Sequence, residues 1–491
     1  MTEPTLRIIN TVERKTSVRV ERQAFLDLCS EAKRVADPRS TMPILATALL
    51  SAGEESLRVA ATDLLRTVDG KVRAAVSTAL TGSLTDLATT LEESARLGLC
   101  EEQSVAPSAG VDAKKLHEVV KALPGAEVEV LFQEKLTLIE TDTYKADKTR
   151  VCSVCRKRSA SALPNGTCAD KPSSTAKLPC GGKLLETSRE FTHTVEVSLL
   201  SGKARFNLRS LPGRDFPKLF AVDAAAWHRV DAAVLREALD KVAPTISQDS
   251  TRSHLNGALL EVGGGLLRAV STDGHRLTKV DRVAATTFST KGFILPLPGV
   301  QELLKFLPAL IGKSKKGAAV KADVEVALSG DEHFHWRKPG GDVVYTQKLE
   351  QAQFPPYDQV IPRDVEKIAV ASRADLVAAA KRMLLSASEK TAGIKMTLQG
   401  QDGGTMQPVT LTLSIDNPDV GDASEDVDGV VGTHCYECPF VFGINGRYLV
   451  SALEEMTSAT VYMGFNGELD PMTLRTAAED ADVVVIMPMR L

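Results

Sequence analysis

The sequence predicts an α+β fold built from repeated helix-plus-strand units, with the helices in one layer and the strands in another. A strand–turn–strand pattern occurs three times along the 491 residues, and each copy follows an amphipathic helix. Each copy is followed by a second helix and another alternating strand, so the chain reads as three units of two similar halves. Six similar halves favour a curved or closed assembly with continuous sheets.

The first halves of the three units align with one another. Residues 42–70 line up with 253–281, and the second strand of both ends in Thr-Asp, while a fainter copy at 392–418 reaches its own aspartate at Asp416. The helices before these copies are expected at 22–36, 232–246 and 373–386. The second halves are "DAKKLHEVVKALPGAEVEVLF", "PGVQELLKFLPAL" and "NGRYLVSALEEMTSATVYMGF". We expect domains at 1–222, 223–364 and 365–491.

Composition limits the classes of function only weakly. The net charge of −4 gives no overall sign of a nucleic-acid partner, so any such partner needs a local basic face. The N-terminus lacks the apolar core of a signal peptide, and no apolar run is long enough to cross a membrane. Without an export signal, the eight cysteines are expected as thiols or metal ligands rather than disulfides. The expected compartment is the cytoplasm.

The segment 145–189 interrupts the first domain and is rich in Ser, Pro, Gly and Lys. Ten lysines and arginines against three acids give it a net charge of +7, the most basic local region. We expect an insertion here, at about 141–196. Its four cysteines, Cys152, Cys155, Cys168 and Cys180, could fill the tetrahedral shell of a structural zinc ion. The alternative is a mobile loop with free thiols, and a local zinc at Cys435 and Cys438 is a weaker possibility.

The stretch "TDGHR" raises the question of catalysis, because Asp273 and His275 could form a general acid–base pair. No nucleophile or metal-ligand cluster lies near them in the sequence, and the sister copy reads Asp63-Leu64-Leu65-Arg66, without a histidine. The alternatives are a strand-end turn with an Asp cap and a Gly at positive φ, or a binding loop. We therefore expect no enzyme activity, and no organic cofactor.

Several motifs occur in an order that resembles the bacterial sliding clamp, the beta subunit of the replicative DNA polymerase. They are "RSTMPIL", "SGKARFNLRSLPGRDFPKL", "LNGALLEV", "TDGHRL", "KLEQAQFPPYDQVIP", "FGINGRYLVSAL" and "VIMPMRL", and they span nearly the whole chain outside the insertion. The resemblance implies the DNA-clamp fold: a head-to-tail homodimeric ring of six similar domains, with helices lining a hole for duplex DNA and sheets outside. It implies a processivity factor that tethers polymerase and other clients and is placed on DNA by a clamp loader. The alternative is a diverged scaffold of the same fold that binds proteins but not DNA.

The resemblance also implies a groove for client peptides, with an adaptable apolar slot and polar edges. By position the groove would include Arg252, Leu255, Thr272, Gly274, His275, Arg276, Leu277, Pro355, Val360, Asn445, Tyr448, Val485, Ile486, Met487, Pro488, Met489, Arg490 and Leu491. Many relatives carry a basic residue where this chain has Gln359, so client preference is expected to differ.

A clamp must hold DNA without reading its sequence, so its DNA contacts should be electrostatic. Basic residues on the expected helices fit this role, and the resemblance adds Arg39 and the loop 248–254. The candidates are Lys33, Arg34, Arg39, Lys114, Lys115, Lys121, Lys241, Gln248, Arg252, Ser253, His254, Lys305, Lys381, Arg382 and Arg447. The other interpretation is that many of these side chains are ordinary solvated helix charges.

Overall fold

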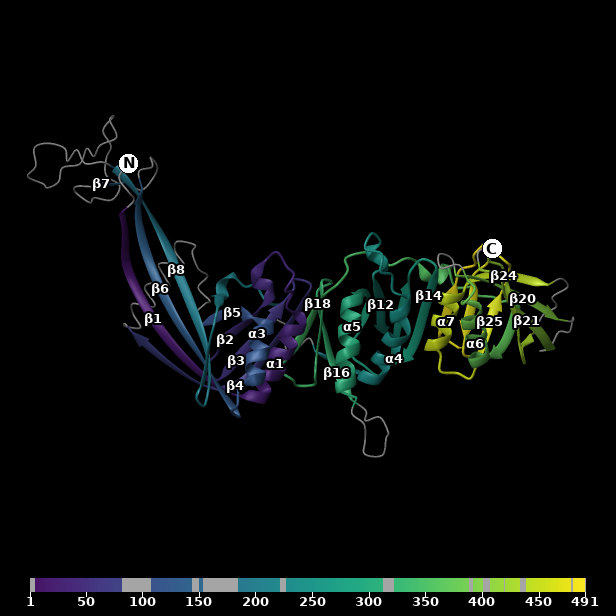
Figure 1. Ribbon diagram of the computed structural model, residues 1–491, viewed down its shortest axis with the longest axis horizontal. Helices are drawn as coiled ribbons and strands as arrows, with labels where there is room; N and C mark the ends of the chain where they lie inside the picture. Colours follow the sequence, from purple (N-terminus) through teal and green to yellow (C-terminus); the bar gives the residue numbers. More distant parts are fainter. Residues whose placement is uncertain are drawn as a thin grey trace, which may run out of the picture. The chain divides into compact units, whose positions relative to one another are not determined.

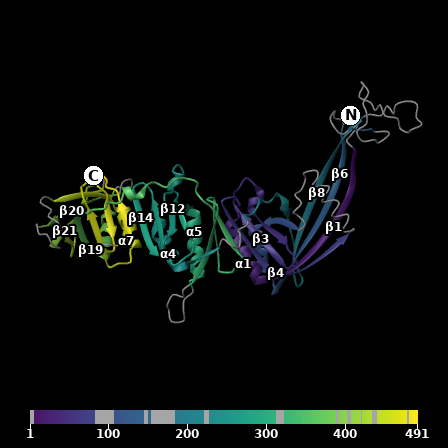
Figure 2. The same cartoon turned by 180° about the vertical axis from the view of Figure 1, so that it is seen from behind.

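The computed structural model describes residues 5–81, 107–143, 150–152, 184–220, 227–311, 322–387, 392–400, 407–418, 420–432, 439–477 and 480–490. The chain divides into two compact units. Unit 1 holds residues 1–220 with 342–345, and unit 2 holds 221–341 with 346–491. Both units combine helices with extended antiparallel sheets (Figures 1 and 2), so the prediction of an α+β fold with separate helical and sheet layers is confirmed.

Unit 1 packs two helices, α1 (Arg22–Val35) and α3 (Ala113–Ala122), against its sheet. The strand order in this sheet is β10-β5-β2-β3-β4-β1-β6-β8-β7, and β9 pairs with β8. The strands are β1 (Thr5–Glu21), β2 (Thr47–Ala52), β3 (Ser56–Thr62), β4 (Arg66–Thr81), β5 (Ser108–Asp112), β6 (Glu127–Thr143), β7 (Arg150–Cys152), β8 (Leu184–Ser201), β9 (Ala204–Leu208) and β10 (Ser210–Pro212). Short 3₁₀ turns occur at Pro43–Ala46 and Gly213–Asp215.

The strands β1, β6 and β8 are unusually long, and in Figure 1 they run well beyond the helices of unit 1. The β6–β8 ladder continues out to the pair Thr143–Glu186. The insertion expected at about 141–196 stays a prediction, while its residues 141–143 and 184–196 belong to paired strands. The alternating, β-branched stretch "TSREFTHTVEV" supplies the reason, since such residues favour strands.

The first part of unit 2 repeats the same order of elements. Its helices are α4 (Ala232–Val242) and α5 (Leu297–Phe306), with 3₁₀ turns at Ala243–Thr245, Ser253–Leu255, Leu307–Ala309 and Tyr357–Gln359. Its strands are β11 (His228–Asp231), β12 (Gly257–Gly263), β13 (Leu266–Thr272), β14 (Arg276–Val283), β15 (Thr290–Pro296), β16 (Asp323–Ser329), β17 (His333–Arg337) and the end of β18 (Val344–Lys348), whose first two residues belong to unit 1.

The last part of unit 2 contains α6 (Arg373–Met383) and α7 (Gly446–Glu455). Its strands are β19 (Lys367–Ser372), β20 (Gly393–Gly400), β21 (Gln407–Ile415), β22 (Ala423–Val427), β23 (Val431–Gly432), β24 (Phe440–Asn445), β25 (Thr460–Phe465), β26 (Met472–Arg475) and β27 (Val483–Ile486). The pairing of β14 with β27 joins both parts of unit 2 into one continuous sheet. The predicted continuity of sheets between repeats is present at this joint.

The helices begin close to where the sequence predicts them but end earlier. Asp231, Ser372 and Asn445 cap the first turns of α4, α6 and α7 with their side chains. Helix α4 stops at Val242 rather than Ile246, because Pro244 lacks the amide that a continuing helix needs. The apolar faces of α6 and α7 pack into a core with β20, β21, β24 and β25.

Candidate functional site

The turn between β13 and β14 is a tightly bonded structure. The Asp273 carboxylate accepts the amides of His275 at 2.9 Å and Arg276 at 3.0 Å, and Nε of Arg276 at 3.0 Å. Thr272 Oγ1 donates to the Arg276 carbonyl at 2.7 Å and accepts the Gly274 amide at 3.1 Å. Gly274 has φ +89°, a conformation that glycine adopts without strain. Asp273 therefore shapes the turn, and its carboxylate is already engaged.

Unit 1 contains the same turn. Asp63 accepts the amide of Leu65 at 3.0 Å, and the amide and Nε of Arg66 at 2.6 and 2.8 Å. Leu64, at the position of Gly274, has φ +74°. The shared pattern supports the interpretation of Thr-Asp-x-x-Arg as a strand-end turn, since the copy without a histidine forms the same bonds.

The turn in unit 2 borders a pocket of about 190 Å³. Its floor is apolar, because Val270, Leu277, Tyr357, Val483 and Val485 form a buried cluster beneath it. The residues that line the pocket are His254, Leu255, Thr272, Gly274, Arg276, Leu277, Pro355, Tyr357, Val360, Val485 and Met487. An apolar slot with a few polar edges suits a short segment that buries hydrophobic side chains.

The C-terminal tail reaches this pocket through strand pairing. Residues 483–486 of β27 pair antiparallel with 276–279 of β14, directly after the turn. The Met487 amide then donates to the His275 carbonyl at 2.9 Å, and the Met489 amide donates to the Gly443 carbonyl at 2.9 Å. Val485 and Met487 thus come to line a pocket that is otherwise built from residues more than 100 positions earlier in the chain.

Tyr448 on α7 closes one side of the turn. The Arg276 guanidinium lies 4.6 Å from the centre of the Tyr448 ring, and the His275 ring stacks on the same tyrosine at 6.3 Å. Burial and the nearby Asp273 carboxylate raise the pKa of Tyr448. Arg276 also donates to the Pro244 carbonyl at 2.6 Å, so its position is fixed from three sides.

Half of the eighteen residues expected in the groove line this pocket. Nine line the pocket: Leu255, Thr272, Gly274, Arg276, Leu277, Pro355, Val360, Val485 and Met487. Arg252 lies against Gly274, Asn445 caps α7, and Arg490 is exposed on the tail. Leu491 lies outside the described residues. Ile486 does not line the pocket: it is fully buried in the core of the last domain, because alternate residues of a strand face opposite sides.

Two lining residues were not expected in the groove. Tyr357 fills the floor and is held by its hydroxyl, which donates to Glu261 at 2.9 Å and accepts from Arg268 at 3.3 Å. Burial, together with Glu261, raises the pKa of this phenol to about 12. His254, which the sequence placed among the DNA contacts, lines the pocket instead. The aromatic residue within "PPYDQV", beside the expected Pro355, was a usable signal for Tyr357.

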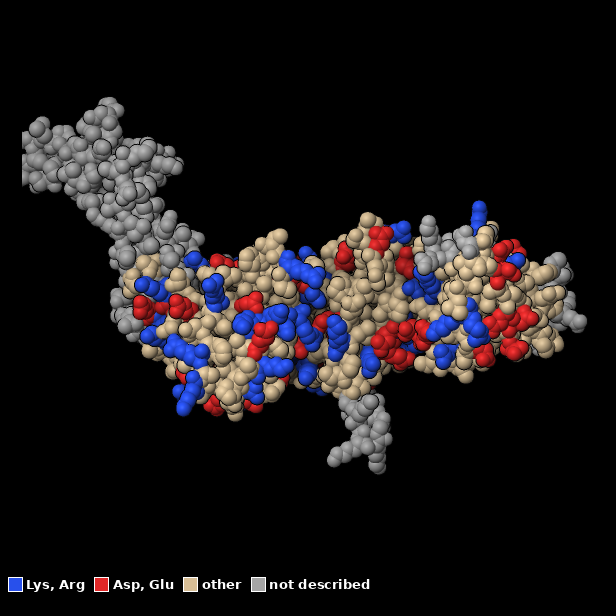
Figure 3. All heavy atoms as spheres, viewed as in Figure 1, with Lys and Arg blue, Asp and Glu red and all other residues tan. Residues whose placement is uncertain are grey.

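The expected DNA contacts separate into two groups. In unit 1, Lys33, Lys114, Lys115 and Lys121 are exposed on α1 and α3, and Arg39 is exposed in the following loop. Blue side chains gather over these helices in Figure 3. Burial, with the charges of Lys33 and Lys121, lowers the pKa of His117 on α3.

The basic residues of unit 2 are largely engaged with acids. Lys241 is mostly buried and lies 2.7 Å from Asp482, and Lys381 lies 2.6 Å from Glu454. Arg382 pairs with Glu425. These three side chains offer less uncompensated charge to a polyanion than the lysines of unit 1, and Lys241 is the least accessible. Gln248, Arg252 and Ser253 are exposed.

The expected zinc ligands Cys155, Cys168 and Cys180 lie outside the described residues, and Cys152 is described only as the end of β7. The described ranges hold no group of three or more His, Cys, Asp or Glu side chains arranged to bind a metal. The zinc site therefore stays a prediction. Within the same ranges, no helix combines the length and apolar character needed to cross a membrane.

Three protein-family models match the chain. They describe the N-terminal, central and C-terminal domains of the DNA polymerase III beta subunit, and they cover residues 16–147, 229–355 and 358–490. The chain is 30% identical to the beta sliding clamp of Pseudomonas aeruginosa over 292 residues, which is 59% of this chain and 73% of that protein. It is 26% identical to the Escherichia coli beta sliding clamp over 291 residues, with the same coverage of both chains.

Solved structures show the same fold. The DNA polymerase III subunit beta of Pseudomonas aeruginosa superposes with a TM-score of 0.66 at 23% identity, over 97% of this chain and all of that one. The beta subunit of Thermotoga maritima gives 0.65 at 19% identity, with the same coverage. One of the similar structures is a Pseudomonas aeruginosa clamp bound to griselimycin.

Proposed function

The chain belongs to the bacterial sliding clamps, the DNA polymerase III beta subunit family, and we propose that it encircles duplex DNA and tethers the replicative polymerase and other clients. The observation that carries this proposal is the intact pocket between the Thr272–Arg276 turn and the C-terminal tail. Tethering needs a site for clients that is separate from the DNA, and this pocket meets that need. A scaffold that binds proteins but not DNA is the alternative.

The proposed client is a short peptide with apolar anchors. Leu277, Tyr357 and Val485 offer a preformed apolar floor, and Val360 and Met487 are partly exposed at its edge, ready to be covered. Arg276 and His275 supply polar groups at one side, where they can fix the register of the peptide backbone. Binding of a fluorescent peptide from the replicative polymerase of the same organism tests this site. We expect saturable binding to the wild-type chain, and the absence of binding by every such peptide contradicts it.

The proposed DNA contacts are the exposed lysines of α1 and α3 with Arg39. Their side chains carry charge but no base-reading geometry, which suits binding that slides along phosphates. Gln248, Arg252 and Ser253 in the exposed loop before Ser253–Leu255 are further candidates. The group of exposed basic side chains in unit 1 favours a clamp that binds DNA over a scaffold that binds only proteins.

We propose no enzyme activity for the chain. The one acid–base pair that the sequence suggested is engaged, since three donors occupy the Asp273 carboxylate. His275 stacks on Tyr448 and offers its carbonyl to Met487, which are structural contacts. In this proposal Asp273 shapes the turn and His275 lies beside the client site, and neither acts as an acid or a base.

We propose that two copies close a ring head to tail, each contributing domains at 1–222, 223–364 and 365–491. The joint within unit 2 shows how neighbouring domains connect, because β14 of one pairs with β27 of the next. By the repeat, β22 corresponds to β14, and β9 corresponds to β27. Among the described strands, β22 pairs only with β21 and β9 only with β8, so each has an open edge.

The two open edges have complementary chemistry. The edge around β22 carries Glu425, Asp426 and Asp428, and red side chains gather over this end of unit 2 in Figure 3. Lys203 lies just before β9 and Arg205 on it, and Phe206 on the same strand is more than a third exposed. Antiparallel pairing of β22 with the β9 of a second copy would match these charges and cover Phe206.

Loading by a clamp loader and action in the cytoplasm belong to the same proposal, since a closed ring cannot thread onto circular DNA unaided. The insertion cysteines Cys152, Cys155, Cys168 and Cys180 are proposed to bind one structural zinc ion through four thiolates. No organic cofactor is needed for tethering.

A further inference from the structure

We propose that Asp482 is a positioning residue for the groove: it fixes β27 on β14 and thereby places Val485 and Met487. The inference rests on the proposed client site, but it concerns residues outside that site, since Asp482 does not line the pocket. Asp482 lies directly before β27, three residues from Val485. It belongs to the last domain, whereas its partners belong to the central one.

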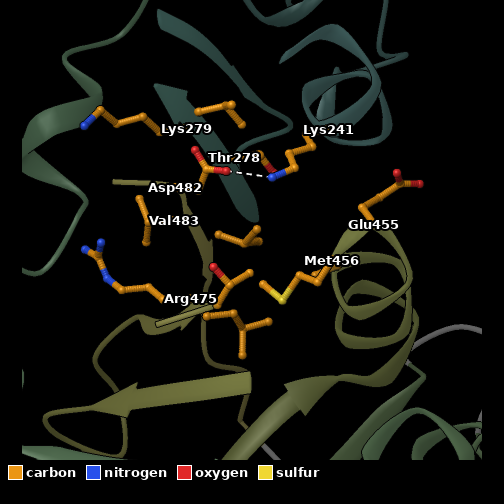
Figure 4. A pocket seen from close by; sticks show the side chains of 13 residues that line it. Lys241, Thr278, Lys279, Glu455, Met456, Arg475, Asp482 and Val483 are labelled. Atoms are coloured by element: carbon orange, nitrogen blue, oxygen red, sulfur yellow. Dashed lines mark hydrogen bonds and ion pairs between the residues drawn. The ribbon is translucent and has the colours of Figure 1, made fainter. Parts of the chain in front are cut away.

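Asp482 is the centre of a cluster of charged groups, the joint cluster, formed with Lys241, Arg282 and the Asp281 amide. Lys241 Nζ lies 2.7 Å from Oδ2, and the two terminal nitrogens of Arg282 lie 2.6 Å from Oδ1 and 2.8 Å from Oδ2. The Asp281 amide donates to Oδ1 at 3.2 Å. Figure 4 shows Lys241 of α4 reaching across to Asp482. One carboxylate thus binds a helix, a strand side chain and a strand amide of the neighbouring domain.

The joint cluster is sheltered from solvent, so each of its ion pairs is screened less by water than an ion pair at the surface. The side chain of Asp482 is 14% exposed, and Lys241 and Arg282 are 17% and 19% exposed. Burial alone would raise the pKa of Asp482, but hydrogen bonds and charges from Arg282 and Lys241 outweigh it and lower the pKa. The carboxylate is therefore charged at neutral pH and holds its partners.

Apolar packing holds the body of β27, since Val483, Val485 and Ile486 are buried, but this packing is incomplete beside the joint cluster. A cavity of about 30 Å³ lies beside the cluster, between Val280 on β14 and Met456 and Leu474 of the last domain. Figure 4 shows Met456 and Asp482 among the side chains that line the cavity. Side chains at a cavity lose contacts that would otherwise fix their position. The joint cluster therefore adds to the apolar packing at Asp482, the residue directly before β27.

The position of β27 decides the shape of the groove. Val483 to Ile486 pair with Lys279 to Arg276 in fixed register, and Val485 then faces the pocket while Ile486 faces the core. A shift by one residue would exchange these faces. Loosening the start of β27 should therefore weaken peptide binding without touching any residue that contacts the peptide.

Glu325 provides a matched control within unit 2. It is 10% exposed, lies 2.8 Å from Arg337 and 3.5 Å from Arg229, and accepts the Gly340 amide at 3.2 Å. Its environment resembles that of Asp482, but it lies on β16 and does not line the pocket. General loss of stability should appear in both variants, whereas loss of groove geometry should appear only in the Asp482 variant.

The experiment compares Asp482→Asn, Asp482→Glu and Glu325→Gln in the full chain, with a fluorescent peptide from the replicative polymerase of the same organism. For Asp482→Asn we expect the Kd to rise about tenfold, which corresponds to about 1.4 kcal/mol. Amide exchange should accelerate in Val483–Ile486 and stay unchanged in Gly257–Gly263. Asp482→Glu should recover most of the affinity, and Glu325→Gln should keep the Kd within about twofold of wild type.

Wild-type affinity in Asp482→Asn overturns the inference while leaving the client site intact. An equal loss in Glu325→Gln also overturns it, because the effect would then be general destabilisation. If the wild-type chain binds no peptide, the proposed function itself fails, which is a separate outcome. Should Asp482→Asn not fold, Lys241→Gln replaces it, with an expected rise of about threefold in Kd and the same pattern of amide exchange.

Discussion

Asp273 and Arg276 are joined through both backbone and side chain: the Asp273 carboxylate accepts the Arg276 amide and its Nε, each at 3.0 Å. Asp63 and Arg66 make the same two bonds in unit 1, at 2.6 and 2.8 Å. The same local structure thus occurs once beside the tail-lined pocket and once in the first domain. Equivalent substitutions in the two turns therefore distinguish the structural role of the Asp–Arg pair from its role in client binding.

Replacing Asp273 by Ala should destabilise its turn and also weaken client binding. Loss of the carboxylate removes three hydrogen bonds and leaves Arg276 held only by Pro244 and Tyr448, at a cost of about 1–3 kcal/mol in the free energy of local unfolding. Asp63→Ala is the control, since it should cost a similar amount in unit 1 and leave peptide affinity unchanged. Amide exchange measures the turns and fluorescence anisotropy measures the peptide. If Asp273→Ala and Asp63→Ala bind the peptide equally well, the turn at Asp273 does not contribute to the groove.

Val360→Glu should sharply weaken peptide binding with little effect on folding. Val360 lines the pocket and is 38% exposed, so a charge there is tolerated by the free chain but opposes an apolar anchor. Losses at such anchors reach about 2 kcal/mol or more. Val283→Glu is the control, because Val283 is 84% exposed and does not line the pocket.

Deletion of residues 489–491 should likewise reduce the affinity for the peptide. If both Val360→Glu and the tail deletion bind the peptide as the wild-type chain does, the client site is not at this pocket.

Reversing a charge at the β9 edge should weaken the homodimer. Arg205→Glu places an acid opposite the acidic β22 edge, and we expect a roughly fivefold rise in the dimer Kd at low salt. Combining it with Asp426→Lys should restore much of the affinity. Sedimentation of the single and double variants measures the effect. A wild-type chain that stays monomeric at micromolar concentration would argue against the ring altogether.

His335 should make the sheet of β16 and β17 sensitive to acid. It is fully buried between Thr346 and Ser329, and burial with the neighbouring His333 lowers its pKa to about 4. In the unfolded chain it titrates near 6.5, so protons favour unfolding below that pH. Its stability contribution is complete above pH 6.5 and is lost as pH falls to about 4, by up to about 3 kcal/mol. Urea unfolding followed by Trp336 fluorescence should show this slope, and His335→Gln should flatten it.

Metal analysis tests the zinc proposal. Purified full-length chain should contain about one zinc ion, and replacement of Cys152 and Cys155 by Ser should remove it. A preparation without zinc whose insertion resists proteases would show that the four cysteines have another role. Replacing Cys29, which is buried and unbridged on α1, should leave the zinc content unchanged.

The repeats made the fold predictable, because alternating strands and amphipathic helices recur with their caps and turns in each unit. The start of β6 was expected as a strand, but the full length of β6 and β8 was not, since the basic, glycine-rich composition of 145–189 hid the strand pattern at its borders. Leu277 and Val485 could be assigned to the groove from motifs alone. The burial of Ile486 and the pairing of Lys241 with Asp482 depend on how β27 pairs with β14, a contact between residues 200 positions apart.

A chain that encloses DNA is held on it by topology rather than by affinity. Loading onto nicked circular duplex DNA tests this: labelled chain is loaded with the matching clamp loader, free protein is removed, and the circle is then cut with a restriction enzyme. We expect the chain to stay on the intact circle at high salt and to leave once free ends appear. Equal retention on circular and cut DNA, or failure to be retained on either, would contradict enclosure.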